Sequence, residues 1–314
     1  YRNDVTLVNM VMSVDPECNP EIPAMLGSSI ATCISDIPFD GPCASTQVGL
    51  IDGEFVINPS LAQKEISDLQ LTVASTREKV IMIEAGANEV PEDKMIEAIY
   101  KAHEVNQEII AFIDKIVAEC GKEKHTYASC AVPEELFEEI KKIVPPEEME
   151  IAVFSDDKQT REENIRQVTA KLEEALADHE DWLEVLGEAV YQYQKKTVRK
   201  MILKDHKRPD GRQITEIRPL AAEIDILPRV HGSGMFTRGQ TQICTVTTLA
   251  PLSDAQRLDG LDEFETSKRY MHHYNFPSYS VGETKPSRGP GRREIGHGAL
   301  AERALVPVLP SAED

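Results

Sequence analysis

Apolar and polar residues alternate along the early part of the chain in a way that predicts β-strands. The predicted strands lie at 46–51, 54–57, 69–73 and 80–83. Asp52-Gly53 separates the first two, and this pair favours a tight hairpin because both central turn positions need positive φ. Residues 5–11 also alternate and predict a further strand.

Helical spacing of apolar residues predicts the next elements. Residues 22–34 suit a buried helix, and 91–119 suit a long one that begins at a proline, which the first helical turn tolerates. Residues 131–205 predict an all-helical segment broken at Pro145-Pro146, with acidic outer faces. We interpret those faces as solvated surface, with a protein-docking surface as the alternative.

From Arg208 the pattern returns to β structure, after a polar linker at 204–208. Strands are expected at 224–227, 234–237, 240–246 and 270–276, and a helix at 299–303. Arg238-Gly239 is the second hairpin candidate. His272 and His273 would point to opposite faces of a strand and could not share one metal ion.

The acidity of the chain is unevenly distributed. The net charge is −20, and residues 1–207 carry −19 of it, whereas residues 208–314 carry 13 cations and 14 carboxylates. A strongly acidic total argues against nucleic-acid binding, which usually requires a basic face. Because the acidity lies almost entirely in the first two thirds, that argument does not extend to the last third.

Cysteine spacing and hydropathy constrain the cellular context. The 6 cysteines show no C-x-x-C spacing, which favours reduced thiols over a disulfide framework or zinc site. No apolar run reaches the roughly 18 residues of a membrane span. We therefore expect a soluble, cytoplasmic protein with no membrane partner. The chain begins at Tyr1 and stops at Asp314 just after an apolar run, and we interpret it as an internal piece of a longer protein.

The segment 291–298 (Gly-Arg-Arg-Glu-Ile-Gly-His-Gly) has a composition suited to phosphate. Arginine offers a planar fork of donors that matches phosphate oxygens, glycine lets backbone N–H groups approach a ligand, and a following helix adds partial positive charge at its N-terminus. The alternative is a surface turn with two solvated arginines. For His297 the alternative is a loop histidine satisfied by backbone groups.

Four ordered sequence blocks between residues 208 and 298 together resemble the second catalytic core of the bacterial polynucleotide phosphorylases. They are Arg208-Pro209-Asp210-Gly211-Arg212, residues 227–242, residues 273–283, and Arg292-Arg293-Glu294-Ile295-Gly296-His297-Gly298. The resemblance extends over the whole chain. Residues 1–125 resemble the C-terminal part of the first core with its trailing helix, 131–205 the all-helical domain, and 208–314 the N-terminal part of the second core.

This resemblance implies an α+β fold, with ribonuclease PH-like cores of the ribosomal protein S5 domain 2-like βαβα type flanking an all-helical domain. It also implies a cytoplasmic homotrimer that takes part in mRNA degradation and RNA processing. The reaction would be reversible phosphorolysis of single-stranded RNA from its 3′ end, with inorganic phosphate as co-substrate and Mg²⁺ or Mn²⁺ as cofactor. Partners of an RNA-degrading complex are possible, and DNA is not expected.

Carried over residue by residue, the resemblance assigns Arg292 and Arg293 to backbone phosphates near the RNA 3′ end. His297 matches the histidine beside the inorganic phosphate. Arg212, Arg229 and Arg238 also match family blocks, but we expect structural roles for them, such as pairing with carboxylates.

The first core is predicted to be catalytically silent. Lys64, Gln70 and Thr72 occupy the positions where the active core carries an Asp, a second Asp and a Lys, and none of them suits Mg²⁺. Residues 19–24 replace the serine-rich phosphate loop. Asp68 alone is expected to be a strand-edge residue.

The catalytic residues of the second core are expected beyond Asp314, so this fragment alone is predicted to be inactive and to contain no metal ligands. The parent protein is expected to be a phosphorolytic exoribonuclease. The alternative is a non-catalytic RNA-binding ring or scaffold subunit with the same fold.

Overall fold

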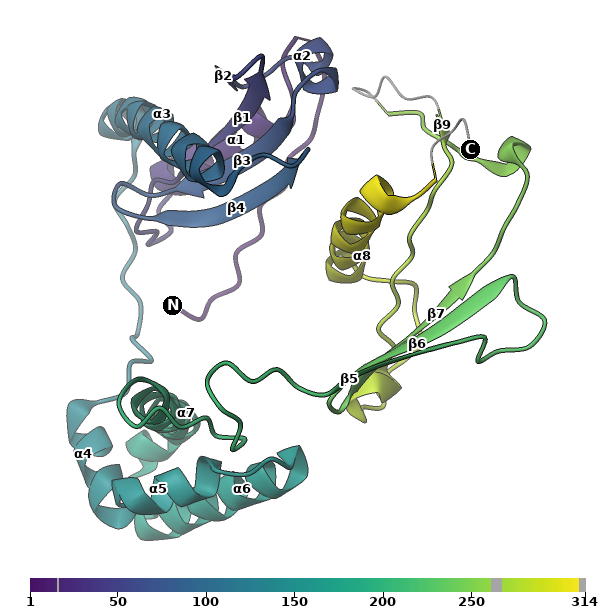
Figure 1. Ribbon diagram of the computed structural model, residues 1–314. Helices are drawn as coiled ribbons and strands as arrows, with labels where there is room; N and C mark the ends of the chain where they lie inside the picture. The colour runs from purple at the N-terminus through teal and green to yellow at the C-terminus, as the bar shows by residue number, and fades with distance from the viewer. Residues whose placement is uncertain (16, 261–266, 311–314) are drawn as a thin grey trace. The chain divides into compact units, whose positions relative to one another are not determined.

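The computed structural model describes residues 1–15, 17–260 and 267–310 (Figure 1). Residues 261–266 and 311–314 of the predicted second core therefore lie outside the described residues. The chain divides into two compact units. One contains Asp4–Thr126 and Ala250–Asp314, and the other Tyr1–Asn3 and Tyr127–Leu249.

The first unit is built on an antiparallel sheet in the order β2-β1-β3-β4. Its strands are β1 (Ala44–Ile51), β2 (Glu54–Ile57), β3 (Leu69–Ser75) and β4 (Val80–Ala87). Its helices are α1 (Glu21–Ile34), the short α2 (Leu61–Glu65) and the long α3 (Glu92–Cys120). The hairpin at Asp52-Gly53 is confirmed, with φ of 51° and 82° at its two turn residues.

Helix α3 covers one face of this sheet (Figure 1). Ala98 and Ala102 are fully buried there, and such small side chains let the helix approach Val48, Leu71 and their neighbours closely. Asn106 of α3 is also buried. Its amide donates to the Val73 carbonyl and to Ser75 Oγ, and its oxygen accepts from Thr46 Oγ1. Among the described residues, no buried side-chain nitrogen or oxygen is left without a partner.

The opposite face of the sheet carries α1. Successive residues of a strand point to opposite faces, so Gln47 lies on the other side from Thr46. Gln47 Nε2 donates to Glu21 Oε2 of α1 at 3.0 Å. Beyond α1, the same face over β3 and β4 carries polar side chains, including Gln70 and Thr72.

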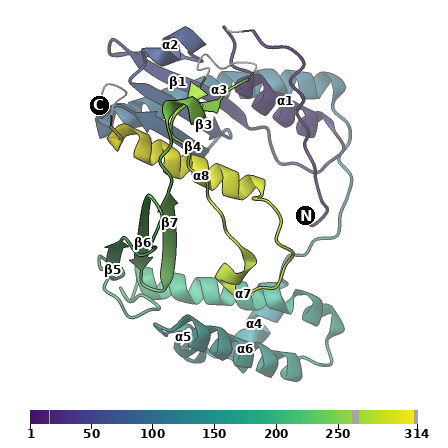
Figure 2. The same ribbon diagram turned by 90° about the vertical axis from the view of Figure 1, so that its right-hand side faces the viewer.

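The second unit contains the predicted helical domain (Figure 2). Its helices are α4 (Glu134–Ile143), α5 (Pro146–Val153), α6 (Lys158–Ala175) and α7 (Glu180–Leu203). They pack around one apolar cluster that includes Leu136, Ile140, Met149, Leu172 and Met201, each essentially inaccessible to solvent. The break predicted at Pro145-Pro146 is confirmed, because α4 ends before it and α5 begins with Pro146.

The predicted polar linker at 204–208 is docked rather than free. The Lys207 N–H donates to the Met201 carbonyl, and the Ser155 N–H donates to the Pro209 carbonyl. Asp210 accepts two guanidinium hydrogen bonds from Arg212, at 2.9 and 2.7 Å. The expected structural role of Arg212 is therefore confirmed, and residues 204–208 form an irregular connection whose backbone is hydrogen-bonded to the end of α7.

Three antiparallel strands follow, β5 (Leu220–Ile224), β6 (Gly232–Arg238) and β7 (Thr241–Thr247), in the order β5-β6-β7. The second predicted hairpin is confirmed, with its turn one residue later at Gly239-Gln240. Arg229 and Arg238 are exposed. The remaining elements are the 3-10 turns η1 (Leu252–Asp254), η2 (Ser278–Val281) and η3 (Val306–Val308), the short strands β8 (Gln256–Arg257) and β9 (Ser267–Lys268), and helix α8 (Arg292–Leu305).

Three strand predictions are wrong. The strand expected at 224–227 is displaced, because β5 ends at Ile224 and Asp225 has a positive φ of 56°. Residues 5–11 are exposed and irregular, with Val8 77% accessible, because no described strand offers them a neighbour for their backbone groups. Residues 270–276 are extended but unpaired with any described strand, since their backbone bonds go to helix α8 instead.

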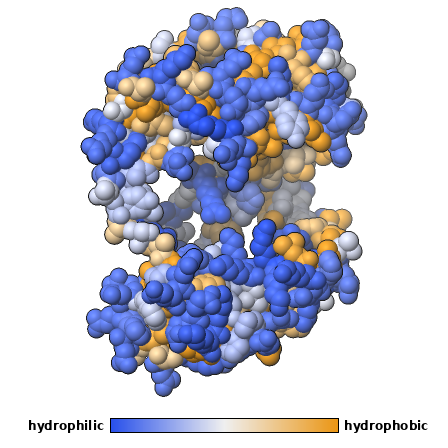
Figure 3. Space-filling model, turned by 90° about the vertical axis from the view of Figure 1, so that its left-hand side faces the viewer, coloured by the Kyte–Doolittle hydropathy of each residue, from blue (hydrophilic) through white to orange (hydrophobic). Residues whose placement is uncertain are grey.

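Exposed apolar side chains interrupt the hydrophilic surface of both units (Figure 3). All 6 cysteines are unpaired. Among the described helices, none is sufficiently long and apolar to span a bilayer. The predicted division at 1–125, 131–205 and 208–314 remains a prediction.

Candidate functional site

The arginine pair lies in the first turn of α8 rather than in a loop. The helix begins at Arg292, so the 299–303 prediction placed its start too late. Glu294 explains the early start, because its carboxylate accepts the Gly291 N–H at 2.7 Å and so satisfies a backbone donor at the helix N-terminus. It also accepts the Phe276 N–H at 2.7 Å. These two backbone hydrogen bonds hold the pKa of Glu294 below its usual value.

Residues 272–276 run alongside α8. The His272 N–H donates to Glu302 near the C-terminal end of the helix, and the Phe276 N–H donates to Glu294 near its start. Between them the Tyr274 ring meets the His297 ring edge-on, with centroids 4.4 Å apart.

Gly298 allows this close approach. It is buried, and a Cβ added there would lie 3.2 Å from Tyr274 Cβ and 3.3 Å from the His272 carbonyl oxygen. Glu302 fixes the far end of the segment. Burial alone would raise its pKa, but the hydrogen bonds from Lys268 and from the His272 N–H outweigh burial and lower it.

The three predicted site residues share this helix. Arg292 and Arg293 are exposed, and within the described part of the chain their guanidiniums have no hydrogen-bond or ion-pair partner. His297 is also exposed and lies about one turn further along the helix. Two unpaired guanidiniums at a helix N-terminus form an arrangement suited to binding phosphate oxygens.

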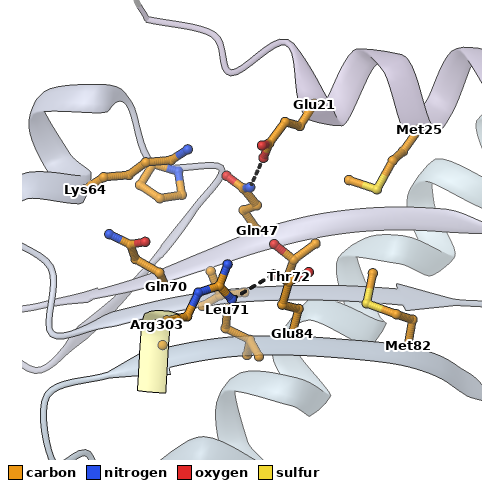
Figure 4. Close-up of a pocket in the computed structure, with 13 residues that line it drawn as sticks. Glu21, Met25, Gln47, Lys64, Gln70, Leu71, Thr72, Met82, Glu84 and Arg303 are labelled. Atoms are coloured by element: carbon orange, nitrogen blue, oxygen red, sulfur yellow. Dashed lines mark hydrogen bonds and ion pairs between the residues drawn. The ribbon is translucent and has the colours of Figure 1, made fainter. Parts of the chain in front are cut away.

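A second candidate site is a cavity of about 420 Å³ on the α1 face of the first sheet (Figure 4). Lys64, Gln70 and Thr72 all line it, so the three positions identified in the sequence share one site. An ammonium, an amide and a hydroxyl do not form a magnesium site, since Mg²⁺ prefers carboxylates and water. Among the described residues no cluster of histidine, cysteine or carboxylate side chains has metal-binding geometry.

The two carboxylates that line the cavity already have partners within the chain. Glu21, at the start of α1, accepts from Gln47 Nε2 at 3.0 Å and from Asn19 Nδ2 at 3.3 Å. Its negative charge therefore occupies the helix N-terminus, where an incoming phosphate would otherwise be favoured. Glu84 of β4 pairs with Arg303 of α8 at 2.7 Å (Figure 4).

Sequence reasoning did not identify several of these residues. Glu21, Glu84 and Arg303 meet at the cavity from three separated elements, and nothing local marks them as neighbours. Glu294 carried a local signal, because a glutamate three residues after a helix N-cap is a capping pattern. No local sequence pattern marked Tyr274 as a contact of His297.

Three family domains match different parts of the chain. Residues 41–105 match the 3′ exoribonuclease family, domain 2, and residues 216–314 match domain 1 of the same family. Residues 135–213 match a family described as polyribonucleotide nucleotidyltransferase, RNA binding domain.

Relatives match the chain from end to end. A polyribonucleotide nucleotidyltransferase of Lachnoclostridium phytofermentans is 77% identical over 312 residues, which is 99% of this chain and 45% of the relative. The proteins of the same name from Ruminiclostridium cellulolyticum and Bacillus cytotoxicus are 55% and 52% identical, over 99% and 100% of this chain and 44% of each relative. The chain belongs to the polyribonucleotide nucleotidyltransferase family.

This membership confirms the predicted fold class, in which ribonuclease PH-type domains flank a helical domain. The chain spans about 45% of the length of the polyribonucleotide nucleotidyltransferases that it matches. The first-core cavity, apart from Glu21, Met25 and Arg303, lies in the domain 2 match, and α8 lies in the domain 1 match.

Proposed function

We propose that this chain is part of a phosphorolytic 3′-to-5′ exoribonuclease and supplies the RNA-binding side of its active site. The observation that carries the proposal is the pair of exposed, unpaired guanidiniums at the first turn of α8, with His297 about one turn away. The similarity to proteins named polyribonucleotide nucleotidyltransferase supports it.

In this reaction an oxygen of inorganic phosphate attacks the phosphorus of the last phosphodiester bond. The bond from that phosphorus to the 3′ oxygen of the preceding nucleotide breaks, and a nucleoside diphosphate leaves. The reverse reaction extends the RNA. Catalysis of such in-line transfer depends on positioning and on neutralising charge.

Each site residue has a proposed task. Arg292 and Arg293 bind backbone phosphates near the RNA 3′ end, and His297 lies beside the inorganic phosphate. The edge-on contact with Tyr274 supports a fixed orientation of the His297 ring. Mg²⁺ or Mn²⁺ would neutralise charge on the transferred phosphoryl group, with ligands expected after residue 314.

The remaining proposals concern the whole protein. We propose a cytoplasmic homotrimer that acts in mRNA degradation, with possible partners in an RNA-degrading complex. We also propose the division into 1–125, 131–205 and 208–314, with the first core catalytically silent. The cavity supports silence, because Lys64, Gln70 and Thr72 offer no magnesium ligand set.

A second candidate function is a non-catalytic RNA-binding ring or scaffold subunit. The cavity of the first core favours this function, because it brings the three site positions together but offers no magnesium ligand set there. The sequence after residue 314 distinguishes the two functions. Absence there of a serine loop or of the Asp/Asp/Lys spacing would reject the enzyme.

Arg292→Ala with Arg293→Ala tests the proposed RNA contacts. We expect weaker binding of a fluorescent single-stranded RNA, with the slope of log affinity against log salt reduced by about 1.4, since each lost phosphate contact on a single strand contributes about 0.7. The measurement is fluorescence anisotropy across a salt series.

Lys94→Gln with Lys101→Gln is the matched control, because it removes the same charge from two lysines that already pair with Glu97 and Glu104. Equal affinity of wild type and the α8 double variant would mean that Arg292 and Arg293 are only solvated surface residues.

A further inference from the structure

Positive charge is concentrated at the end of the helical domain. Residues 195–207 contain six cations and one carboxylate, within a segment 1–207 whose net charge is −19. Lys195, Arg199 and Lys200 of this stretch are exposed on α7, and we call them the α7 basic face. The rest of the helical domain is acidic, so this concentration of positive charge is a local exception.

The cations of the neighbouring helices have partners. In α4, Lys141 and Lys142 pair with Glu138 and Glu139. In α6, every cation contacts a carboxylate or a carbonyl oxygen within the described structure: Lys158 with Glu162, Arg161 with Ser155, Arg166 with Glu163, and Lys171 with Glu148. By contrast, no side chain of the α7 basic face has a hydrogen bond or ion pair to any described residue.

The helix dipole accounts for only part of this arrangement. Cations stabilise the last helical turn, where Lys200 lies, but the effect decays within that turn. Lys195 lies two turns before the end of α7 at Leu203. Acidic residues instead occupy the first half of the same helix, at Glu180, Asp181, Glu184 and Glu188. The charge on α7 is therefore segregated along its length.

An aromatic side chain extends the basic face. Tyr191 is 58% exposed and lies four residues before Lys195, which in turn lies four before Arg199, so all three share the outward face of the helix. An aromatic ring beside unpaired cations is the combination by which proteins bind single-stranded nucleic acid, with bases stacked on the ring and phosphates held by the cations.

We propose that the α7 basic face and Tyr191 form a second RNA-binding surface, which holds single-stranded RNA away from the 3′ end bound at α8. The face extends about 7.5 Å along the helix from Lys195 to Lys200, and Tyr191 lies about 6 Å before it. The acidic first half of α7 repels RNA and so limits the surface to its C-terminal half. This proposal rests on the proposed function for the identity of its ligand, and the family matched by residues 135–213 is described as RNA binding.

The test uses the whole chain and a fluorescent single-stranded RNA. Lys195→Gln, Arg199→Gln and Lys200→Gln combined should weaken binding on the order of tenfold at low salt and reduce the salt slope by about 2, for three lost contacts of about 0.7 each. Tyr191→Ala should weaken RNA binding about fivefold or more, the loss of one stacked base.

Lys141→Gln, Lys142→Gln and Lys158→Gln combined are the matched control. They remove the same charge from cations that are already paired, and RNA affinity should be unchanged. Because none of the substituted side chains is buried, the thermal melting curves of all variants should match that of the wild type.

Two further comparisons make the outcome decisive. Poly-L-glutamate serves as a second probe, and Tyr191→Ala should leave its binding unchanged. If the triple α7 variant loses poly-L-glutamate binding but keeps RNA binding, the face binds an acidic protein segment and the RNA proposal is wrong.

The second comparison measures Arg292→Ala with Arg293→Ala in parallel. If only the α8 double variant loses RNA binding, the α7 proposal is wrong and the assignment of the α8 arginines stands. If only the triple α7 variant loses RNA binding, the α7 proposal is supported and the assignment of the α8 arginines is wrong.

Discussion

At the scale of single residues, the role of an arginine depends on whether a carboxylate of the same chain already pairs with it. Arg292 and Arg293 are unpaired and so are available to an external anion, whereas Arg212 is engaged inside the chain. Its guanidinium donates twice to Asp210, and the side chains of the two residues are only 12% and 18% exposed. Each of these arginines belongs to a family block, so their different roles came from the resemblance and not from the residue type.

Asp210→Asn should destabilise the second unit near neutral pH. The Arg212 hydrogen bonds hold the pKa of Asp210 below its usual value. A depressed pKa contributes stability above the unfolded pKa of about 3.9, and this contribution is lost as pH falls through the folded value. We expect a loss of about 1–3 kcal/mol in the free energy of unfolding at pH 7. Urea denaturation measures it, and a loss that does not shrink toward pH 3 would contradict the ionic origin.

At the scale of elements, local sequence patterns predicted structure wherever the determinants were local. Both hairpins follow from their turn residues, and the bundle helices follow from spacing and proline breaks. The segment 270–276 was predicted as a strand and is not one, because the N–H groups of His272 and Phe276 bond to glutamates 30 and 18 residues away. Alternation cannot reveal a partner at that distance.

Gly298→Ala should displace residues 272–276 from α8. Its new Cβ would lie 3.2 Å from Tyr274 Cβ and 3.4 Å from Tyr274 N, so the segment must shift. Hydrogen exchange at the His272 and Phe276 amides should accelerate. Gly296→Ala is the control, since nothing lies within 4 Å of its new Cβ, and a helical Gly→Ala change stabilises by roughly 0.5–1 kcal/mol. Unchanged exchange in Gly298→Ala would show that this packing does not hold the segment.

At the scale of the whole molecule, the chain carries two sites of opposite character. The first-core cavity keeps its three predicted positions together but fills them with Lys64, Gln70 and Thr72, and Glu21 occupies the adjoining helix start. Helix α8 presents unpaired arginines. The sequence analysis identified both sets of residues, because the family resemblance gives the positions and the residue at each position can be read from the sequence. It could not reveal Glu21, Glu84 or Arg303, which meet only after folding.

The central claim is that this chain binds RNA through α8 but does not degrade it. The most direct measurement incubates the chain with a 5′-labelled single-stranded RNA, Mg²⁺ and inorganic phosphate, and follows RNA binding, RNA length and released nucleoside diphosphate together. We predict binding that depends on Arg292 and Arg293, with no shortening and no nucleoside diphosphate. Phosphate-dependent shortening with release of nucleoside diphosphate would contradict the account, because the catalytic groups would then lie within residues 1–314.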